Sequence, residues 1–224
     1  MSETANFDKL AGSYRWLEAF TFGPALQHCR LTYLARMANA RRALVLGDGD
    51  GRFTAALLRA SPNITLDAID SSAAMLAALQ RRAGKNANRV RTTQADARTW
   101  QPGPEKTSQE KYDLIATHFF LDCLSSDEAA ALAAKLHSAA APGALWAISE
   151  FHIPDTRFGR VIAAPLVAAL YRAFGLLTGL TTRRLPAYHG PIQAAGFRLA
   201  ARRERLRGLL AAELWHAPDA KPLP

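Results

Sequence analysis

The sequence has few cysteines, no single tract that gathers its basic residues and no secretory leader pattern at its start. Cys29 and Cys123 are the two cysteines among 224 residues, and they lie far apart without CxxC or Cys/His ligand spacing. This excludes a disulfide framework and a zinc site. The opening MSETANFDKLAGSYRW contains acidic residues and no apolar core, unlike a signal peptide. We expect a cytoplasmic protein without a metal.

The charge balance is basic, with 28 Lys and Arg against 19 Asp and Glu, a formal net charge of +9 and a sequence pI near 10.1. Such a balance fits either an anionic partner or an ordinary solvated surface. The arginines are spread along the chain in pairs, which favours the second interpretation. These pairs are Arg41 and Arg42, Arg81 and Arg82, Arg183 and Arg184, and Arg202 and Arg203.

Long apolar runs are also scarce, and only VIAAPLVAALYRAFGLLTGL, residues 161–180, approaches the roughly 20 residues that span a bilayer. Arg172, Pro165 and two glycines argue against a span. We expect a lid or a buried helix here, with docking on a membrane surface as the alternative. A 49% hydrophobic and 21% charged composition is typical of a soluble globular chain.

The elements expected from the pattern alternate between strand and helix, which predicts an α/β, doubly wound, mostly parallel sheet. Two N-terminal helices, interrupted near Gly23 and Pro24, precede this alternation, and two strands paired through a turn at Gly208 follow it. Strands are expected at 43–46, 64–70, 90–94, 112–119, 144–151, 197–206 and 208–217, and helices at 52–60, 72–82, 126–140 and 188–195.

A glycine-rich turn follows the first strand in ALVLGDGDGRFTAALL, residues 43–58, where Gly47, Gly49 and Gly51 alternate with Asp48 and Asp50. Glycine allows a sharp turn and a close approach of the backbone to a ligand. The spacing GxGxG differs from the GxGxxG of dinucleotide sites, and no GK[ST] follows for a P-loop. A phosphate-binding turn is therefore disfavoured.

Two aspartates follow the next two strands, Asp70 in IDSSAAML and Asp96 in QADART. A carboxylate about 20 residues beyond such glycines can accept both hydroxyls of a ribose, although Asp70 can also cap the helix after it. Asp96 can accept from an adenine amino group, with the Ala97 amide beside it. Parallel strands bring all three signals to one edge of the sheet, where a single adenosine could contact them.

With these motifs the sequence resembles the class I S-adenosylmethionine-dependent methyltransferases, and it looks most like the C-methyltransferases of ubiquinone and menaquinone biosynthesis. The segments that carry the resemblance extend over most of the chain. They are FDKLAGSYRWLEAFTFGPALQHCR, LVLGDGDG, IDSSAAML, QADA, YDLIATHFFLDCL, PGALWAISEFHIP and AAGF.

The resemblance implies a Rossmann-like sheet of seven strands with an antiparallel C-terminal strand, a helical flap and a helical lid. One methyltransferase domain is expected over residues 1–224. It divides into a flap at 1–40, a cofactor-binding core at 41–152, an apolar lid at 153–190 and C-terminal strands at 191–224. Val45 stands where relatives usually have an acidic residue, and Asp48 is a candidate substitute.

The implied cofactor is S-adenosyl-L-methionine, and the implied partner is a small, lipophilic or aromatic acceptor. His118 is the candidate base, ahead of His152, His189 and Asp122, and Tyr14 is expected to fold over the sulfonium. The cofactor residues expected are Gly47, Asp48, Gly49 and Gly51 for the methionine group, Asp70 for the ribose, Ser71 and Met75 beside the adenine, and Asp96 and Ala97 at its edge.

Other functions are compatible with parts of the pattern. The basic charge suggests a nucleic-acid methyltransferase, which the absence of an NPPY-type motif disfavours. Val45 suggests a protein that binds S-adenosylmethionine without catalysis. The GDGDG turn is also similar to the GGGDG turn of aminopropyltransferases. A monomer and a homodimer are both compatible with the sequence.

Overall fold

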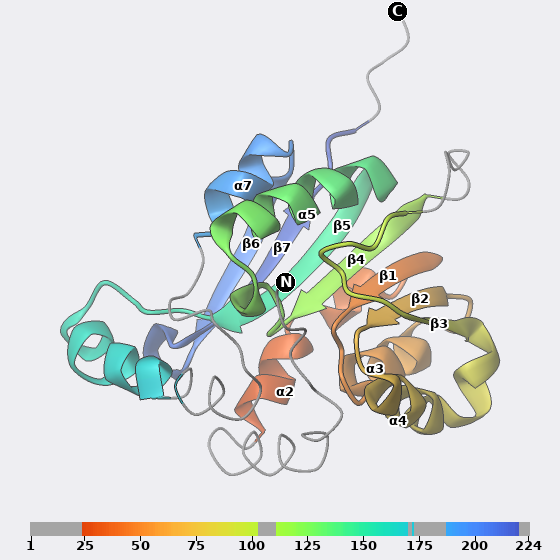
Figure 1. The fold of residues 1–224 in the computed structure, drawn as a ribbon, viewed down its shortest axis with the longest axis horizontal. Coiled ribbons are helices and arrows are strands. Elements are labelled where there is room, and N and C mark those ends of the chain that lie inside the picture. The colour runs from red at the N-terminus through yellow and green to blue at the C-terminus, as the bar shows by residue number, and fades with distance from the viewer. Residues whose placement is uncertain (1–23, 103–110, 170–171, 173–186, 220–224) are drawn as a thin grey trace, which may run out of the picture.

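The computed structural model describes residues 24–102, 111–169, 172 and 187–219. Their strands form one seven-stranded sheet in the order β3-β2-β1-β4-β5-β7-β6 (Figure 1). β1 to β5 are parallel, whereas β7 is antiparallel to both β5 and β6. The strands are β1 (Arg42–Leu46), β2 (Thr65–Asp70), β3 (Val90–Gln94), β4 (Tyr112–His118), β5 (Ala140–Phe151), β6 (Arg198–Arg205) and β7 (Leu210–His216). The predicted fold class is confirmed.

Helices cover both faces of the sheet, with α5 and α7 on one face and α3 and α4 on the other (Figure 1). The α-helices are α2 (Ala25–Arg30), α3 (Arg52–Ala60), α4 (Ala73–Ala83), α5 (Ser126–Ala139) and α7 (His189–Ala194). Shorter helical turns are η2 (Leu34–Met37), η3 (Gly84–Arg89), η5 (Leu121–Cys123), the π-helical η6 (Gly159–Ala163) and η7 (Leu206–Gly208).

The alternation of side chains along β1 explains the two layers. Leu44 and Leu46 pack into the core that contains α5, and Ala43 and Val45 pack into the core that contains α3 and α4. Because successive strand residues point to opposite faces, a strand buried on both faces appears in the sequence as a continuous apolar run. Val45 is 1% exposed, so its position within the sheet is a core position.

Local signals fix where the helices begin. Ser125 accepts from the amide of Glu128, whose carboxylate accepts from the Ser125 amide, which forms a capping box at α5. Ser72 caps α4 by accepting from the Met75 amide. Each cap satisfies amides that a helix cannot pair internally.

The predicted N-terminal helices are described only from residue 24 onward. Here α2 ends at Arg30 and a separate 3-10 turn, η2, follows, so the predicted second helix is shorter than the periodicity suggests. The Thr32 hydroxyl donates to the carbonyl of His28 at 3.0 Å, a local bond that competes with helical continuation.

The predicted lid begins as helix, with η6 followed by helical residues 164–169. Most of the remaining insertion, 170–171 and 173–186, lies outside the described residues. Ala163 and Val167 pack on Leu209, beside the turn between β6 and β7. Over the described ranges, no helix is both long and apolar enough to cross a membrane.

Candidate active site

The sheet order places a ligand site next to β1. From β1 the chain continues through β2 to β3 on one side, and then returns to place β4 on the other side of β1. Loops that leave neighbouring strands in opposite directions open a crevice at the carboxyl ends of those strands. The glycine turn leaves β1 at this point, Asp70 ends β2, and His118 ends β4.

Gly47, Gly49 and Gly51 all have positive φ angles, of 64°, 58° and 80°, but their surroundings differ. A Cβ on Gly51 would come within 2.8 Å of the Leu79 Cα, and a Cβ on Gly47 would overlap the ring of Phe120. Among the described residues, a Cβ on Gly49 would meet only the Met75 sulfur, at 3.8 Å. Gly47 and Gly51 thus pack closely against other parts of the protein, whereas Gly49 leaves room beside it within the described part of the chain.

Asp48 serves the turn itself. Its carboxylate accepts from the amides of Phe53, at 3.2 Å, and Thr54, at 2.8 Å, both in the first turn of α3. Burial raises the pKa of this carboxyl, whereas these amide bonds and the charge of Arg30 oppose the rise. The carboxylate therefore fastens the glycine turn to α3.

Asp70, Ser71 and Met75 lie together at the end of β2 and the start of α4. One carboxylate oxygen of Asp70 accepts from the Ser72 amide at 2.9 Å, which is the helix-side role that the sequence allowed. Ser71 is exposed, and its carbonyl accepts from the side chain of Gln94 at 3.2 Å. Of the three, Met75 is the one that lies beside Gly49, with its sulfur 3.8 Å from where a Cβ on that glycine would be.

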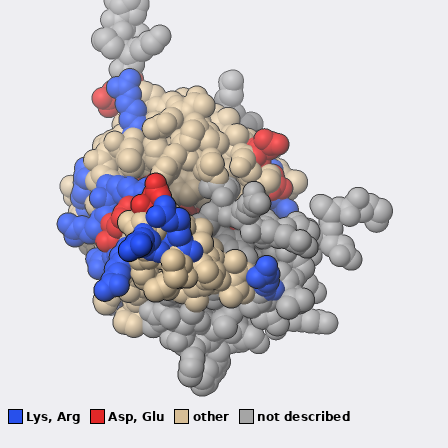
Figure 2. All heavy atoms as spheres, turned by 90° about the vertical axis from the view of Figure 1, so that its left-hand side faces the viewer, with Lys and Arg blue, Asp and Glu red and all other residues tan. Residues whose placement is uncertain are grey.

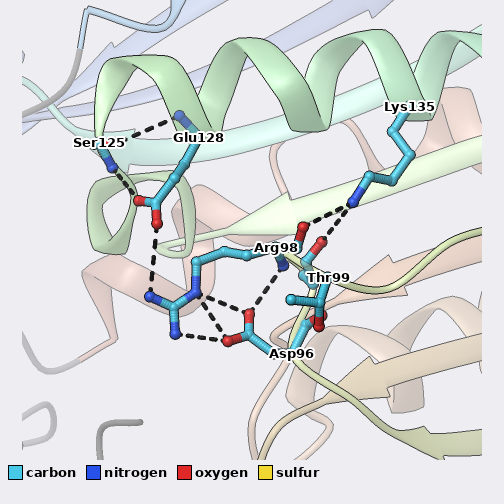
Figure 3. Close-up of polar contacts among 7 residues, drawn as sticks. Asp96, Arg98, Thr99, Ser125, Glu128 and Lys135 are labelled. Carbon is cyan, nitrogen blue, oxygen red and sulfur yellow. Dashed lines mark hydrogen bonds and ion pairs between the residues drawn. The ribbon is translucent and has the colours of Figure 1, made fainter. Parts of the chain in front are cut away.

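Asp96 lies in a polar network that joins the loop after β3 to α5 (Figure 3). Arg98 donates to both carboxylate oxygens of Asp96, at 2.6 to 3.0 Å, and lies 3.7 Å from Glu128. Hydrogen bonds from Arg98 hold the pKa of Asp96 below its usual value. Lys135 donates to the carbonyls of Ala97 and Arg98, which anchors the loop. Sequence reasoning missed both cations, because the motif drew attention to the carboxylate of Asp96 and not to Arg98, and because the partners of Lys135 are backbone carbonyls distant in sequence.

His118 is 4% exposed at the end of β4. Its Nδ1 lies 3.0 Å from the Ser149 hydroxyl, and its ring contacts Phe53 at a centroid distance of 4.3 Å. Within the described part of the chain its Nε2 has no hydrogen-bond partner. Burial, together with the charge of Arg30, lowers the pKa of His118 to about 3. The imidazole is therefore neutral at physiological pH. In this form it can accept or donate a hydrogen bond, but it is a weak base.

Each of the other described candidates for a base has its own partner or neighbour in the structure. His152 bonds through Nδ1 to the Gly208 carbonyl at 2.9 Å, and His189 bonds to the buried Glu213 at 2.8 Å. Asp122 lies in η5, soon after β4, and burial together with the charge of Asp122 raises the pKa of Cys123. Tyr14 lies outside the described residues.

Two buried ionisable side chains at this edge were not singled out from the sequence. Arg30, on α2, is 8% exposed, lies 5.0 Å from the Phe119 ring centroid and lowers the pKa of His118 electrostatically. Glu150, on β5, is 1% exposed and accepts from the amides of Phe120 and Leu121. Burial, with the nearby charge of Asp122, raises the pKa of Glu150 well above its ordinary value. A charged residue within an apolar segment was the available signal for both.

No metal centre is evident within the described ranges, where no three His, Cys, Asp or Glu side chains gather as ligands. The described edge instead offers a glycine turn with an open face, three carboxylates tied to backbone or cation, and a neutral imidazole. Such a set can hold a polar, cationic organic molecule by hydrogen bonds and charge.

Comparison with known proteins agrees with this geometry. Residues 44–146 match the family model described as a methyltransferase domain. Trans-aconitate 2-methyltransferase of Delftia acidovorans is 33% identical over 121 residues, which is 54% of this chain and 41% of that protein. The chain therefore spans less than half the length of this curated relative.

Solved structures of methyltransferases share the fold. An O-methyltransferase family protein from Burkholderia thailandensis superimposes with a TM-score of 0.69 and 17% identity, over 98% of this chain and 66% of that one. The N-methyltransferase NodS from Bradyrhizobium japonicum, in complex with S-adenosyl-L-homocysteine, gives 0.63 and 15%, over 89% of each chain. Residues 44–146 thus match a methyltransferase domain, and the chain has the fold of these methyltransferases, one of which is bound to the demethylated form of S-adenosylmethionine. None of these three relatives is, by its name, a quinone C-methyltransferase.

Proposed function

We propose that this chain is an S-adenosylmethionine-dependent methyltransferase whose acceptor is a small, lipophilic or aromatic molecule. The observation that carries the proposal is the open face of Gly49, bordered by Met75 and lying at the strand edge where Asp70 ends β2. The match of residues 44–146 to a methyltransferase domain supports the reaction class. The roles of individual residues and the nature of the acceptor are part of the proposal.

The residues at this edge suit the parts of the proposed cofactor. Asp70 would accept the ribose hydroxyls, Ser71 and Met75 would border the adenine, and Asp96 with the Ala97 amide would meet its edge. Gly49 would face the methionine group, with Gly47 and Gly51 shaping the turn that carries it and Asp48 holding that turn in place. When bound, S-adenosylmethionine supplies an electrophilic methyl group on a sulfonium.

Arg30 provides the positive charge that a cofactor carboxylate requires. Its guanidinium is buried, and its charge acts at both Asp48 and His118, on either side of the crevice. Charge-assisted hydrogen bonds from arginine to carboxylate are among the stronger polar contacts in proteins. We therefore assign Arg30 to the methionine carboxylate.

Methyl transfer depends chiefly on holding two reactants in line, which can contribute about 7–11 kcal/mol, whereas a general base adds about 10²- to 10⁴-fold in rate. A histidine with a pKa of about 3 removes protons poorly at neutral pH. His118 therefore acts best through its unpartnered Nε2, as a neutral group that orients a polar atom of the acceptor.

The lipophilic acceptor is inferred from the insertion that follows β5. The predicted stripe of Ile162, Leu166, Leu170, Tyr171, Phe174 and Leu177 is described only at its first two members. Leu166 packs in a cluster with Leu209, and Ile162 is 53% exposed. Part of this stripe is thus core packing, and the remainder supports an apolar acceptor.

Isothermal calorimetry tests the proposal, with S-adenosylmethionine, its decarboxylated analogue and NAD as ligands. We expect selective binding of S-adenosylmethionine. Asp70→Asn keeps an oxygen acceptor for the Ser72 amide but removes the charge, and it should weaken binding more than tenfold, since hydrogen bonds to charged groups contribute about 1.5–3 kcal/mol. Unchanged affinity in Asp70→Asn would refute the ribose assignment.

Arg30→Gln provides a second arm. It should weaken binding of S-adenosylmethionine more than tenfold and leave the decarboxylated analogue nearly unaffected, because that analogue lacks the carboxylate. Equal losses for both ligands would show that Arg30 supports the fold and not the carboxylate. Binding of S-adenosylmethionine without turnover on phenols, quinones or other acceptors would favour a non-catalytic binding protein.

A further inference from the structure

Exposed apolar side chains gather at one end of the molecule. The large apolar side chains that are exposed among the described residues are Ile153, Val161, Ile162, Leu199 and Leu206. Four of these, all except Leu199, lie in two segments, residues 153–169 and the η7 turn between β6 and β7. Val161 is 72% and Ile162 53% exposed. Side chains of this kind scattered singly need no explanation, but a contiguous group marks an interaction surface.

Contacts between the two segments show that they form one surface. The Arg207 guanidinium lies 5.7 Å from the centroid of the Phe158 ring. Leu209 packs against Ala163 and Val167, and a Cβ on Gly208 would lie 3.0 Å from Pro154. Val161 and Ile162 directly precede Ala163 in η6, so they lie beside this contact.

Arginines border the apolar group. Residues 153–169, residue 172 and residues 204–209 contain two acids, Asp155, which lies 3.5 Å from Arg160, and Glu204, which lies 3.0 Å from Arg202. The same ranges contain five arginines, which are Arg157, Arg160, Arg172, Arg205 and Arg207. Figure 2 looks onto this end of the molecule and shows a group of Lys and Arg side chains, with Asp and Glu side chains among them, beside uncharged surface. We call residues 153–169 with 205–209 the arginine-rimmed face.

We propose that the arginine-rimmed face docks on a membrane surface that contains anionic lipid. Exposed aliphatic side chains on a short helical segment can enter the boundary between headgroups and acyl chains, while arginines around them attract anionic headgroups. A nucleic acid would match the arginines but would leave Val161 and Ile162 without a role. No described helix can span a bilayer, so the contact is peripheral.

The position of this face gives the contact a use. Phe151 ends β5 opposite Leu210, so the η7 turn and the segment after β5 lie at the same edge of the sheet as the glycine turn. Docking would therefore bring the proposed active site toward the bilayer, where lipophilic acceptors concentrate. This last step rests on the proposed function, but the docking itself does not.

Vesicle flotation tests the proposal with the full chain. The protein should float with phosphatidylcholine vesicles that contain phosphatidylglycerol, and far less with phosphatidylcholine alone. The double change Val161→Ser with Ile162→Ser should lower the partition coefficient about tenfold or more. Leu199→Ser removes an exposed leucine outside the face and should have no effect.

A second pair of variants tests the charges. Arg157→Gln with Arg160→Gln should weaken flotation, whereas Arg81→Gln with Lys85→Gln, on and just after α4, removes the same charge elsewhere and should leave it unchanged. The proposal would be overturned if both pairs of variants lost flotation equally. It would also be overturned if salt abolished binding while the Val161→Ser, Ile162→Ser variant still bound, because either result would indicate nonspecific electrostatic attraction. Absence of flotation with either vesicle would also overturn it. Calorimetry with S-adenosylmethionine on the same variants tests the proposed function separately.

Discussion

Gly49 and Gly51 have the same backbone conformation, but we expect substitution by alanine to weaken ligand binding more at Gly49 and to lower stability more at Gly51. Both have φ angles in the left-handed region, 58° and 80°, where a side chain costs roughly 1–2 kcal/mol. At Gly49 the added methyl meets, among the described residues, only the Met75 sulfur, at 3.8 Å, an ordinary contact. At Gly51 it comes within 2.8 Å of the Leu79 Cα, so that α4 must move, which adds about 1–3 kcal/mol.

The unfolding free energy of the ligand-free protein should therefore fall by about 1–2 kcal/mol in Gly49→Ala and by about 2–5 kcal/mol in Gly51→Ala. The affinity for S-adenosylmethionine should follow the reverse order. Gly49→Ala puts a methyl group into the space assigned to the ligand and should bind at least tenfold more weakly, a loss of about 1.4 kcal/mol. Gly51→Ala should retain more of its affinity wherever it remains folded.

Urea denaturation gives the stabilities, and calorimetry below the denaturation midpoint gives the affinities. The reasoning would be refuted if Gly49→Ala bound S-adenosylmethionine like the unmodified protein, because Gly49 would then not face the ligand. It would also be refuted if Gly49→Ala were as unstable as Gly51→Ala, because the contact of Gly51 with α4 would then have no energetic weight.

The buried ionisable groups lead to three further expectations. The raised pKa of Glu150 means that the folded protein keeps this proton above the unfolded pKa near 4.3, so the unfolding free energy falls as the pH rises from there toward the folded pKa. Glu150→Gln should therefore become more stable relative to the unmodified protein over that pH range. A stability difference that stays constant with pH in urea denaturation would contradict this. The pKa of Glu213 is shifted in the opposite direction: burial acts to raise it, but hydrogen bonds from His189 and Trp215 and the charge of Arg202 lower it. The stability that the ionised Glu213 contributes is therefore lost as the pH falls through the folded pKa. Glu213→Gln should make the unfolding free energy less dependent on pH on the acid side. For His118→Ala we expect slower turnover with an unchanged pH–rate shape between pH 6 and 8, because a group with a pKa of about 3 does not titrate there; the loss of a titration step near neutrality would instead restore the base assignment.

The sheet could be predicted from sequence because strands buried on both faces show as apolar runs, and because α4 and α5 begin at recognisable caps, Ser72 and Ser125. The glycine turn and Asp70 were found because strand ends meet at one edge. Arg30 and Glu150 could not be selected from the sequence as candidate site residues, since their importance comes from burial beside residues far away in sequence.

The different work of the three glycines was equally hidden from the sequence. The pattern treats Gly47, Gly49 and Gly51 alike, whereas Phe120, just before η5, approaches only the first, and Leu79, on α4, approaches only the last. Asp48 and Asp96 show the same limit. Their contacts within the protein, those of Asp48 with the α3 amides and those of Asp96 with Arg98, could not be read from the motifs.

The place of β7 has a consequence for synthesis of the chain on the ribosome. β7 is the last strand in sequence, yet it lies between β5 and β6 and pairs with both. Until residue 216 has left the exit tunnel, the sheet edge at β5 has no neighbour and β6 has nothing to pair with. An apolar strand with an open edge can pair with another chain. The nascent protein thus depends on late completion of its sheet, and slow translation of the last strands would prolong the interval in which it can aggregate.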